Sequence, residues 1–160
     1  MKLGERRRRL GLKGEMLLAL MPTLTVLFVL ALVETLSRQR LLFASLASSA
    51  FLIYLDPEGA INHVRTLVLA QAGSASLGLA CYLLLGPGYF SGGVAMVLAI
   101  IAMVTLDAMH PPAVSTALVF GLRAGDESNL ALFLMAVAVT AVLIVLQRIA
   151  VWTLRRFKMR

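Results

Sequence analysis

The chain has 160 residues, of which 60% are hydrophobic and 14% are charged, whereas soluble domains have roughly 45–50% and 25%. A water-soluble fold of this size could not bury that much apolar surface, so the composition indicates a protein embedded in lipid. The net charge of +7 does not favour nucleic acid, because ten of the fifteen Lys and Arg lie within residues 1–13 and 155–160, beside apolar runs. Basic residues there bind lipid headgroups, so we expect membrane lipids and no nucleic acid as partners.

The first apolar run, Leu17–Leu36, is about a membrane thickness long and follows a basic segment, residues 1–16. This layout is that of a secretory signal, but no A-x-A-like cleavage pattern closes the run, so we interpret it as a retained first span. Arg38 and Arg40 separate it from a shorter run, Leu41–Leu55, which is rich in small residues. Small faces of this kind let helices approach closely.

Four further apolar runs are separated by polar and turn-forming residues: Thr66–Leu85, Gly93–Met109, the short run Ala113–Leu122, and Leu130–Leu154, which a basic tail at 155–160 closes. We therefore expect an all-α, polytopic membrane protein with a transmembrane domain at residues 17–154. Four long transmembrane helices would be joined by two short ones, which are either half-length or re-entrant.

The two short runs resemble each other at an offset of 67 residues, at which Ser48 and Ser49 align with Ser115 and Thr116. The long runs on either side of each short run overlap at the same offset, so the chain resembles two long, short, long units, a 3+3 repeat. Biased apolar sequence also produces chance matches of this kind. In transporters built from such repeats, binding sites lie where the interrupted segments meet.

Charge counting predicts that both termini are cytoplasmic. If all six runs cross, the side with both termini also holds Arg65, and only Arg38, Arg40 and Arg123 lie on the other side. If the two short runs are re-entrant, the termini still share a side, so both topologies stay open. The excess of basic residues places the termini in the cytoplasm, most simply that of a bacterial plasma (inner) membrane.

The most informative stretch contains His110, Pro111 and Pro112 after a long apolar run. Two consecutive prolines must end or break the preceding helix, whereas a new helix can begin at once, because proline is favoured in a first turn. We therefore predict a broken helix whose second half presents free N–H groups and a positive dipole end. At membrane depth, such an end would bind a small anion.

Asp107 and His110 lie three residues apart, so on a helix they would share a face and hydrogen bond as a coupled pair of unassigned protonation. Such a pair could bind an anion or pass a proton. Alternatively, both residues only cap the break at the membrane surface. The other candidate site residues either line a polar path or join helices: Gln71, Ser48, Ser49, Ser115 and Thr116.

Catalytic and metal sites are not expected in this sequence. Cys81 is the single cysteine, and the two histidines and scattered carboxylates have no metal-ligand spacing. The chain also lacks a nucleophile elbow, a phosphate-binding loop and a dinucleotide fingerprint. We therefore expect neither an enzyme nor a cofactor.

The region from about Leu41 to Leu154 resembles the HPP family of integral membrane proteins, named for a His-Pro-Pro motif. The resemblance rests on Asp56-Pro57 after a small-residue run and on His110-Pro111-Pro112 leading into Ser115-Thr116-Ala117-Leu118. It implies four membrane-spanning helices. Because some members are implicated in nitrite transport, it also implies a small transporter or channel for nitrite or another small anion, with its site at this motif.

A chain this small would need to form a homo-oligomer, or to use its internal repeat, to enclose a path. The alternative function is a non-transporting membrane scaffold or accessory subunit, in which the polar residues only join helices.

Overall fold

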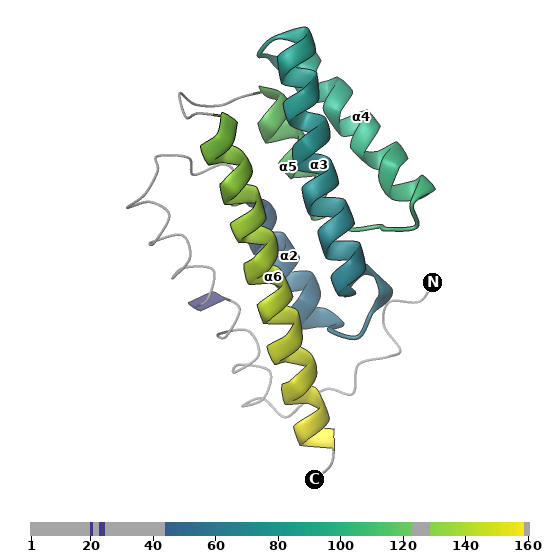
Figure 1. The fold of residues 1–160 in the computed structure, drawn as a ribbon. Helices are drawn as coiled ribbons and strands as arrows, with labels where there is room; N and C mark the ends of the chain where they lie inside the picture. Colours follow the sequence, from purple (N-terminus) through teal and green to yellow (C-terminus); the bar gives the residue numbers. More distant parts are fainter. Residues whose placement is uncertain (1–19, 21–22, 25–43, 123–128, 159–160) are drawn as a thin grey trace.

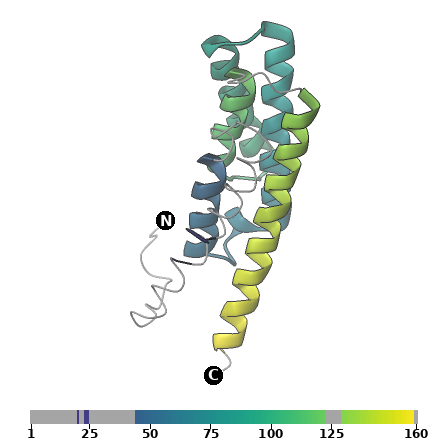
Figure 2. The ribbon, with the colours of Figure 1, turned by 90° about the vertical axis from the view of Figure 1, so that its left-hand side faces the viewer.

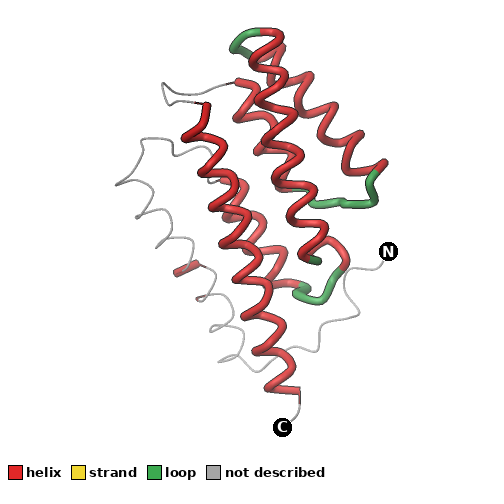
Figure 3. Tube along the Cα trace, viewed as in Figure 1, coloured by secondary structure: helices red, strands yellow, loops and turns green. Residues whose placement is uncertain are grey.

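The computed structural model describes residues 20, 23–24, 44–122 and 129–158, which form helices with short connections and no strand. The all-helical fold class is confirmed for this part of the chain. Five α-helices make up most of it (Figures 1 and 3): α2 (Ala44–Leu55), α3 (Val64–Leu85), α4 (Tyr89–Thr105), α5 (Pro112–Leu122) and α6 (Asn129–Lys158), with a 3₁₀ turn, η2 (Ala60–Asn62), before α3.

Helix α3 is the central element, because it contacts α4, α5 and α6. The two short helices, α2 and α5, run in opposite directions from the level at which their first turns meet (Figures 1 and 2). From there α2 leads toward the C-terminal end of α6, and α5 leads toward the turn between α3 and α4 (Figure 1). The N-terminal ends of both short helices therefore lie inside the bundle.

Two of the described helices contain a segment long and apolar enough to cross a membrane, Val64–Leu85 and Phe133–Thr153. Helices α2 and α5 have 12 and 11 residues, which rise about 16–18 Å, so neither crosses a hydrocarbon layer of about 30 Å alone. The first predicted span, residues 17–36, lies outside the described residues apart from residues 20, 23 and 24. Four long helices and the 3+3 repeat therefore stay predictions.

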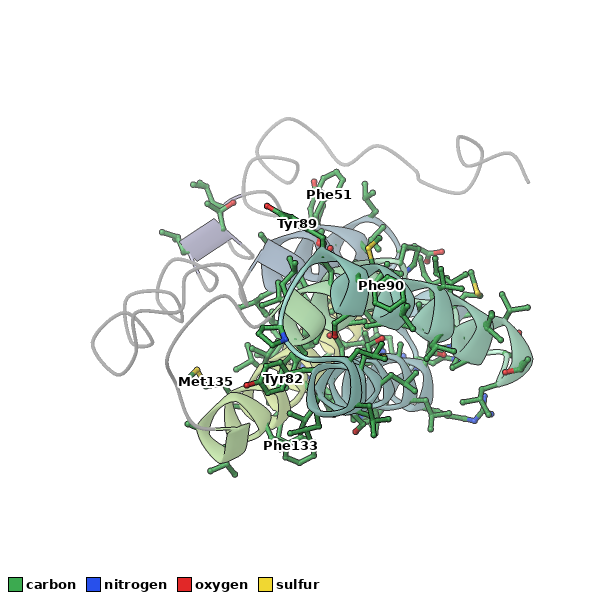
Figure 4. All side chains as sticks on the ribbon, turned by 90° about the horizontal axis from the view of Figure 1, so that it is seen from above. Phe51, Tyr82, Tyr89, Phe90, Phe133 and Met135 are labelled. Carbon is green, nitrogen blue, oxygen red and sulfur yellow. The ribbon has the colours of Figure 1, made fainter. Side chains whose placement is uncertain are left out.

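Large apolar side chains cover the outside of the bundle. Leu84 is 83% exposed and Val104 is 61% exposed, and Figure 4 shows Phe51 of α2 and Phe133 of α6 at opposite edges of the bundle. Water would make so many exposed apolar groups unfavourable, whereas lipid solvates them. The outer surface therefore fits a membrane location.

Helix α4 begins at Tyr89, four residues earlier than the predicted start at Gly93, and it ends four residues earlier than the predicted end at Met109. The turn before it is confined to Gly86, Pro87 and Gly88, and both glycines have positive φ angles, 80° and 134°. The predicted start was late because Gly92, which lies inside α4, was assigned to the turn. The predicted end was late because the chain leaves the helix at Asp107, which has a positive φ of 48°.

Gly92 lies inside α4, at a close contact with α5 that leaves little room for a side chain. A Cβ added at Gly121 would lie 2.8 Å from the Cα of Gly92, and one added at Gly78 of α3 would lie 2.6 Å from the Ala117 carbonyl oxygen of α5. Side chains larger than hydrogen do not fit at these positions. Helix α5 is thus held by backbone-to-backbone packing against both α3 and α4.

The last helix continues through Arg155 and Arg156, which the sequence had assigned to a separate tail, as far as Lys158. Near its C-terminal end, Gln147 Nε2 donates to the Pro57 carbonyl over 3.2 Å, and Arg155 lies 3.4 Å from the Glu58 carboxylate. The connection between α2 and α3 is therefore attached to the C-terminal part of α6.

Candidate functional site

The break after α4 begins with a helix end of the Schellman type. The Ala108 N–H donates to the Met103 carbonyl over 2.9 Å and the Asp107 N–H to the Val104 carbonyl over 3.4 Å, while Asp107 itself has a φ of 48°. This left-handed position is usually glycine, although aspartate is among the few other residues that adopt it readily. Asp107 therefore ends α4.

The predicted pairing of Asp107 with His110 is wrong. Asp107 is exposed, whereas the His110 side chain is completely buried. Both ring nitrogens of His110 are occupied elsewhere, since Nε2 lies 2.8 Å from Ser49 Oγ and Nδ1 lies 3.0 Å from the Ile61 carbonyl oxygen. The three-residue spacing brings two side chains together only on a continuous helix, and α4 ends at Thr105.

The predicted set of free N–H groups at the start of α5 is also wrong. Pro111 and Pro112 have no N–H to offer. The next two amides are used locally, because Ala113 N–H donates to the His110 carbonyl over 2.9 Å and Val114 N–H to the Pro111 carbonyl over 3.1 Å. The two prolines therefore begin α5 directly after His110, and the amides of Ala113 and Val114 have no hydrogen left for an anion.

The candidate site is a run of buried hydrogen bonds that joins α2, α3, α5 and the break, which we call the polar chain. It starts at His110, bonded to Ser49, and continues from Ser49 Oγ to Gln71 Nε2 over 3.3 Å. Gln71 Oε1 accepts from Thr116 Oγ1 over 2.7 Å, and Thr116 Oγ1 lies 3.1 Å from Ser45 Oγ. All five side chains are at most 4% exposed.

The Ile61 carbonyl fixes the direction of these bonds. A carbonyl only accepts, so Nδ1 of His110 carries a hydrogen, and in a neutral ring Nε2 then accepts from Ser49. Since the Ser49 hydrogen is used there, its oxygen accepts from the Gln71 amide nitrogen, and the amide oxygen faces Thr116. All donors thus point from Thr116 toward Ile61, an arrangement in which hydrogen bonds strengthen one another.

Four of the predicted site residues meet in the polar chain, and the others do not. Ser48 precedes Ser49 on α2, and Ser115 precedes Thr116 on α5. Both preceding side chains point away from the polar chain, because adjacent helical residues lie about 100° apart around the axis. Pro112 is buried as the first residue of α5. The predicted residues that are exposed and outside the polar chain are Ser48, Asp107, Pro111 and Ser115.

Two buried polar residues of this region were missed by sequence reasoning. Ser45 lies four residues before Ser49, on the same face of α2, so helical spacing could have identified it. Asn62 Nδ2 donates to the carbonyls of Leu52 and Asp56, both over 2.8 Å, and so caps the end of α2. No signal near Asn62 in the sequence indicates that role, because it depends on how the loop folds back.

A small cavity lies beside the Thr116 end of the polar chain. Its volume is about 10 Å³, which is room for about one water molecule. Polar residues form one wall and apolar residues of α6 form the other; the lining residues are Ser45, Gln71, Thr116, Met135, Ala136 and Val139. The polar chain therefore ends at a cavity that α6 covers.

A comparison with protein families gives one match. The family model described as "HPP, transmembrane region" matches residues 9–158, which is a longer region than the one beginning at about residue 41 on which the sequence resemblance rests. No curated protein and no solved structure matched the chain.

Proposed function

The chain belongs to the HPP family of membrane proteins, and from that premise we propose that it is a small transporter or channel for a small anion such as nitrite. The polar chain is the observation that carries this proposal. It places a buried histidine and four other polar side chains inside a bundle with an apolar outer surface. Ionisable groups within membrane spans are costly and most often mark the path of a substrate or ion.

The chemistry of the polar chain favours an anion over a cation. Its side chains offer ring, amide and hydroxyl hydrogens, and no carboxylate takes part in it. The acid closest along the chain, Asp107, is exposed. An anion beside Gln71 and Thr116 would therefore face no buried carboxylate, and the polar chain could donate to it once its internal hydrogen bonds rearrange.

Passage of an anion requires a second conformation, because the present cavity holds about one water molecule. Helix α6 is the element that would have to move, and the flexible Met135 side chain lies on its cavity wall. We further propose that copies of the chain associate as a homo-oligomer, which would help to enclose a path.

A non-transporting scaffold or accessory subunit is the second candidate function. The observation that favours it is the internal satisfaction of the polar chain, whose bonds connect α2, α3 and α5 without any ligand. Polar side chains in membrane bundles also serve only to join helices. The two functions differ in whether the purified protein moves an anion.

Nitrite entry into proteoliposomes tests the proposal. We expect entry faster than into empty vesicles for the wild-type protein, entry at the empty-vesicle rate for His110→Ala, and wild-type entry for Thr140→Val. Thr140 is a matched control, because it is buried but its hydroxyl bonds to Ala136 of its own helix. Wild-type entry no faster than into empty vesicles would favour the scaffold.

We also propose a bacterial plasma-membrane location with both termini cytoplasmic, and neither catalysis nor a cofactor. The orientation is supported by the end of α6, where Arg155 and Arg156 lie near the connection that precedes Arg65. Basic residues gather on the cytoplasmic side of membrane proteins. A reporter that is active only in the cytoplasm can be fused after Arg160 to test the orientation. We expect this fusion to be active, and an inactive fusion would show that the C-terminus lies on the opposite side of the membrane.

A further inference from the structure

The polar chain contains one group that can gain a proton, the His110 ring, and one that can turn over, the Gln71 amide. With a neutral ring, the Ile61 carbonyl sets the direction of every bond. In that direction the amide oxygen of Gln71 faces Thr116, and both residues line the cavity. The cavity wall then presents an acceptor, which repels an anion.

A proton on Nε2 of His110 would reverse the direction. The ring would donate to Ser49 Oγ, and Ser49 would turn its own hydrogen toward Gln71. The amide can accept it only by turning over, which exchanges oxygen and nitrogen with almost no change of shape. Each pair of heavy atoms in the polar chain keeps its hydrogen bond, so the reversal needs no movement of the backbone.

The reversed polar chain would point donors at the cavity. The Gln71 nitrogen would donate to Thr116 and keep a second hydrogen, while the hydroxyl hydrogen of Thr116 would be released from Gln71. Both side chains line the cavity, and the opposite wall is apolar. Once movement of α6 has enlarged the cavity, an anion there would meet N–H and O–H groups in a low-dielectric setting, where the attraction of a charged imidazole is strong.

A charged His110 would have no carboxylate partner within the described part of the chain. Its two side-chain contacts are Ser49 Oγ and the Ile61 carbonyl. The acidic and basic side chains on the segments around it are all exposed: Asp56, Glu58, His63, Arg65 and Asp107. Tyr54 of α2 and Cys81 of α3 are also titratable, but they are neutral in their usual forms. A buried charge is unfavourable without a counter-charge, and an anion in the cavity would supply one.

We infer that the anion binds together with one proton, that this proton resides on Nε2 of His110, and that reorientation of the Gln71 amide links the two events. The proton comes from bulk water and forms the ring N–H bond, and the monovalent anion balances its charge. Because coupling between two ligands is reciprocal, the proton strengthens anion binding as much as the anion strengthens proton binding. The inference rests on the proposed function, since it requires an anion to bind.

Calorimetric titration of the purified full chain with sodium nitrite tests the inference. Titrations in two buffers of different ionisation enthalpy give the number of protons taken up. For the wild type we expect about one proton per nitrite and an affinity that weakens about tenfold per pH unit on the alkaline side. His110→Gln can hydrogen bond but cannot take up a proton, so it should bind nitrite without proton uptake, while Thr140→Val should match the wild type.

A second measurement leaves the polar chain unaltered and therefore does not depend on the folding of His110→Gln. The chain has two histidines, so in a His63→Gln background a ring-nitrogen NMR spectrum reports His110 alone. We expect a ring protonated only at Nδ1 without nitrite and at both nitrogens with nitrite.

The possible results separate the inference from the proposed function. Nitrite binding without proton uptake, with an unchanged His110 ring, would overturn the inference and leave anion transport in place. Absence of both nitrite binding and nitrite entry into proteoliposomes would overturn the two together.

Discussion

Helix α5 is held in two different ways along its length. Its C-terminal half packs by shape, where Gly121 meets the backbone of Gly92 in α4 and Phe120 covers Gly78 of α3. Its N-terminal half is held by hydrogen bonds, because Thr116 bonds to Gln71 at the centre of the polar chain. One half therefore has no freedom to rearrange, whereas the reversal of hydrogen bonds that we infer for the other half needs no movement of the backbone.

Because of this difference, we expect the two halves of α5 to respond differently to substitution. Lipid removes the hydrophobic driving force between helices, so close packing of small residues supplies much of their association, while a membrane hydrogen bond contributes only about 0.6 kcal/mol on average. We therefore expect substitutions at the glycine contacts to affect mainly the folded state. Substitutions in the polar chain should affect mainly nitrite uptake.

The largest effect on stability is expected for Gly78→Ala and Gly121→Ala. Each added methyl group would lie within 3 Å of backbone atoms, so α5 must shift, at a cost of about 1–3 kcal/mol or more. Gly73→Ala and Gly93→Ala are matched controls, because a Cβ meets nothing within 4 Å at either position. Thermal unfolding in detergent should show a large loss for the first pair and unchanged or raised stability for the second. Equal losses would contradict the packing account.

A smaller loss of stability is expected for Gln71→Leu, which keeps side-chain volume but removes two hydrogen bonds. We expect a destabilisation of about 1–2 kcal/mol together with nitrite uptake at the empty-vesicle rate. The same unfolding assay and liposome uptake measure both quantities. Retained uptake would show that Gln71 only joins helices.

The smallest change is expected for Asp107→Gly, which relieves the left-handed backbone at the end of α4. Stability should rise by at most about 1–2 kcal/mol, the cost of a left-handed residue with a Cβ, and nitrite uptake should remain at the wild-type rate. A strong loss of uptake would instead support the Asp107–His110 pair that the structure replaced. Unfolding and uptake measured on the same preparation decide between the two.

Sequence reasoning predicted the helical class and the two short helices because apolar run lengths are local signals. The order of the described helices followed from the polar breaks between the runs. Sequence reasoning misplaced the start of α4, since glycine serves both turns and close helix contacts. It misplaced the end of α4, since Asp107 takes a left-handed position that glycine usually occupies. Whether Gly92 belongs to a turn or a contact depends on Gly121, which lies far away in the sequence.

Because sequence reasoning uses local signals, it also predicted only part of the candidate site. Its residues were identified by their polarity within apolar runs, and His110 by the prolines that follow it. The hydrogen-bond partners of these residues were not identified. His110 bonds to Ser49, 61 residues away in the sequence, whereas the prediction paired it with Asp107, three residues away. Local spacing indicates which polar residues matter, but only the packing of α2 against α5 brings them together.

We attribute anion movement to the buried polar chain and not to the polarity of this region as such. Nitrite uptake by Ser49→Ala and Ser48→Ala, at equal folded protein in the vesicles, tests this attribution most directly. The two adjacent serines receive the same substitution, but Ser49 is buried and bonded to both His110 and Gln71, whereas Ser48 is exposed and bonds to a backbone carbonyl of α2. We predict uptake reduced at least about tenfold for Ser49→Ala, the loss of about 1.4 kcal/mol of stabilisation, and wild-type uptake for Ser48→Ala. Equal uptake by the two variants would contradict the account.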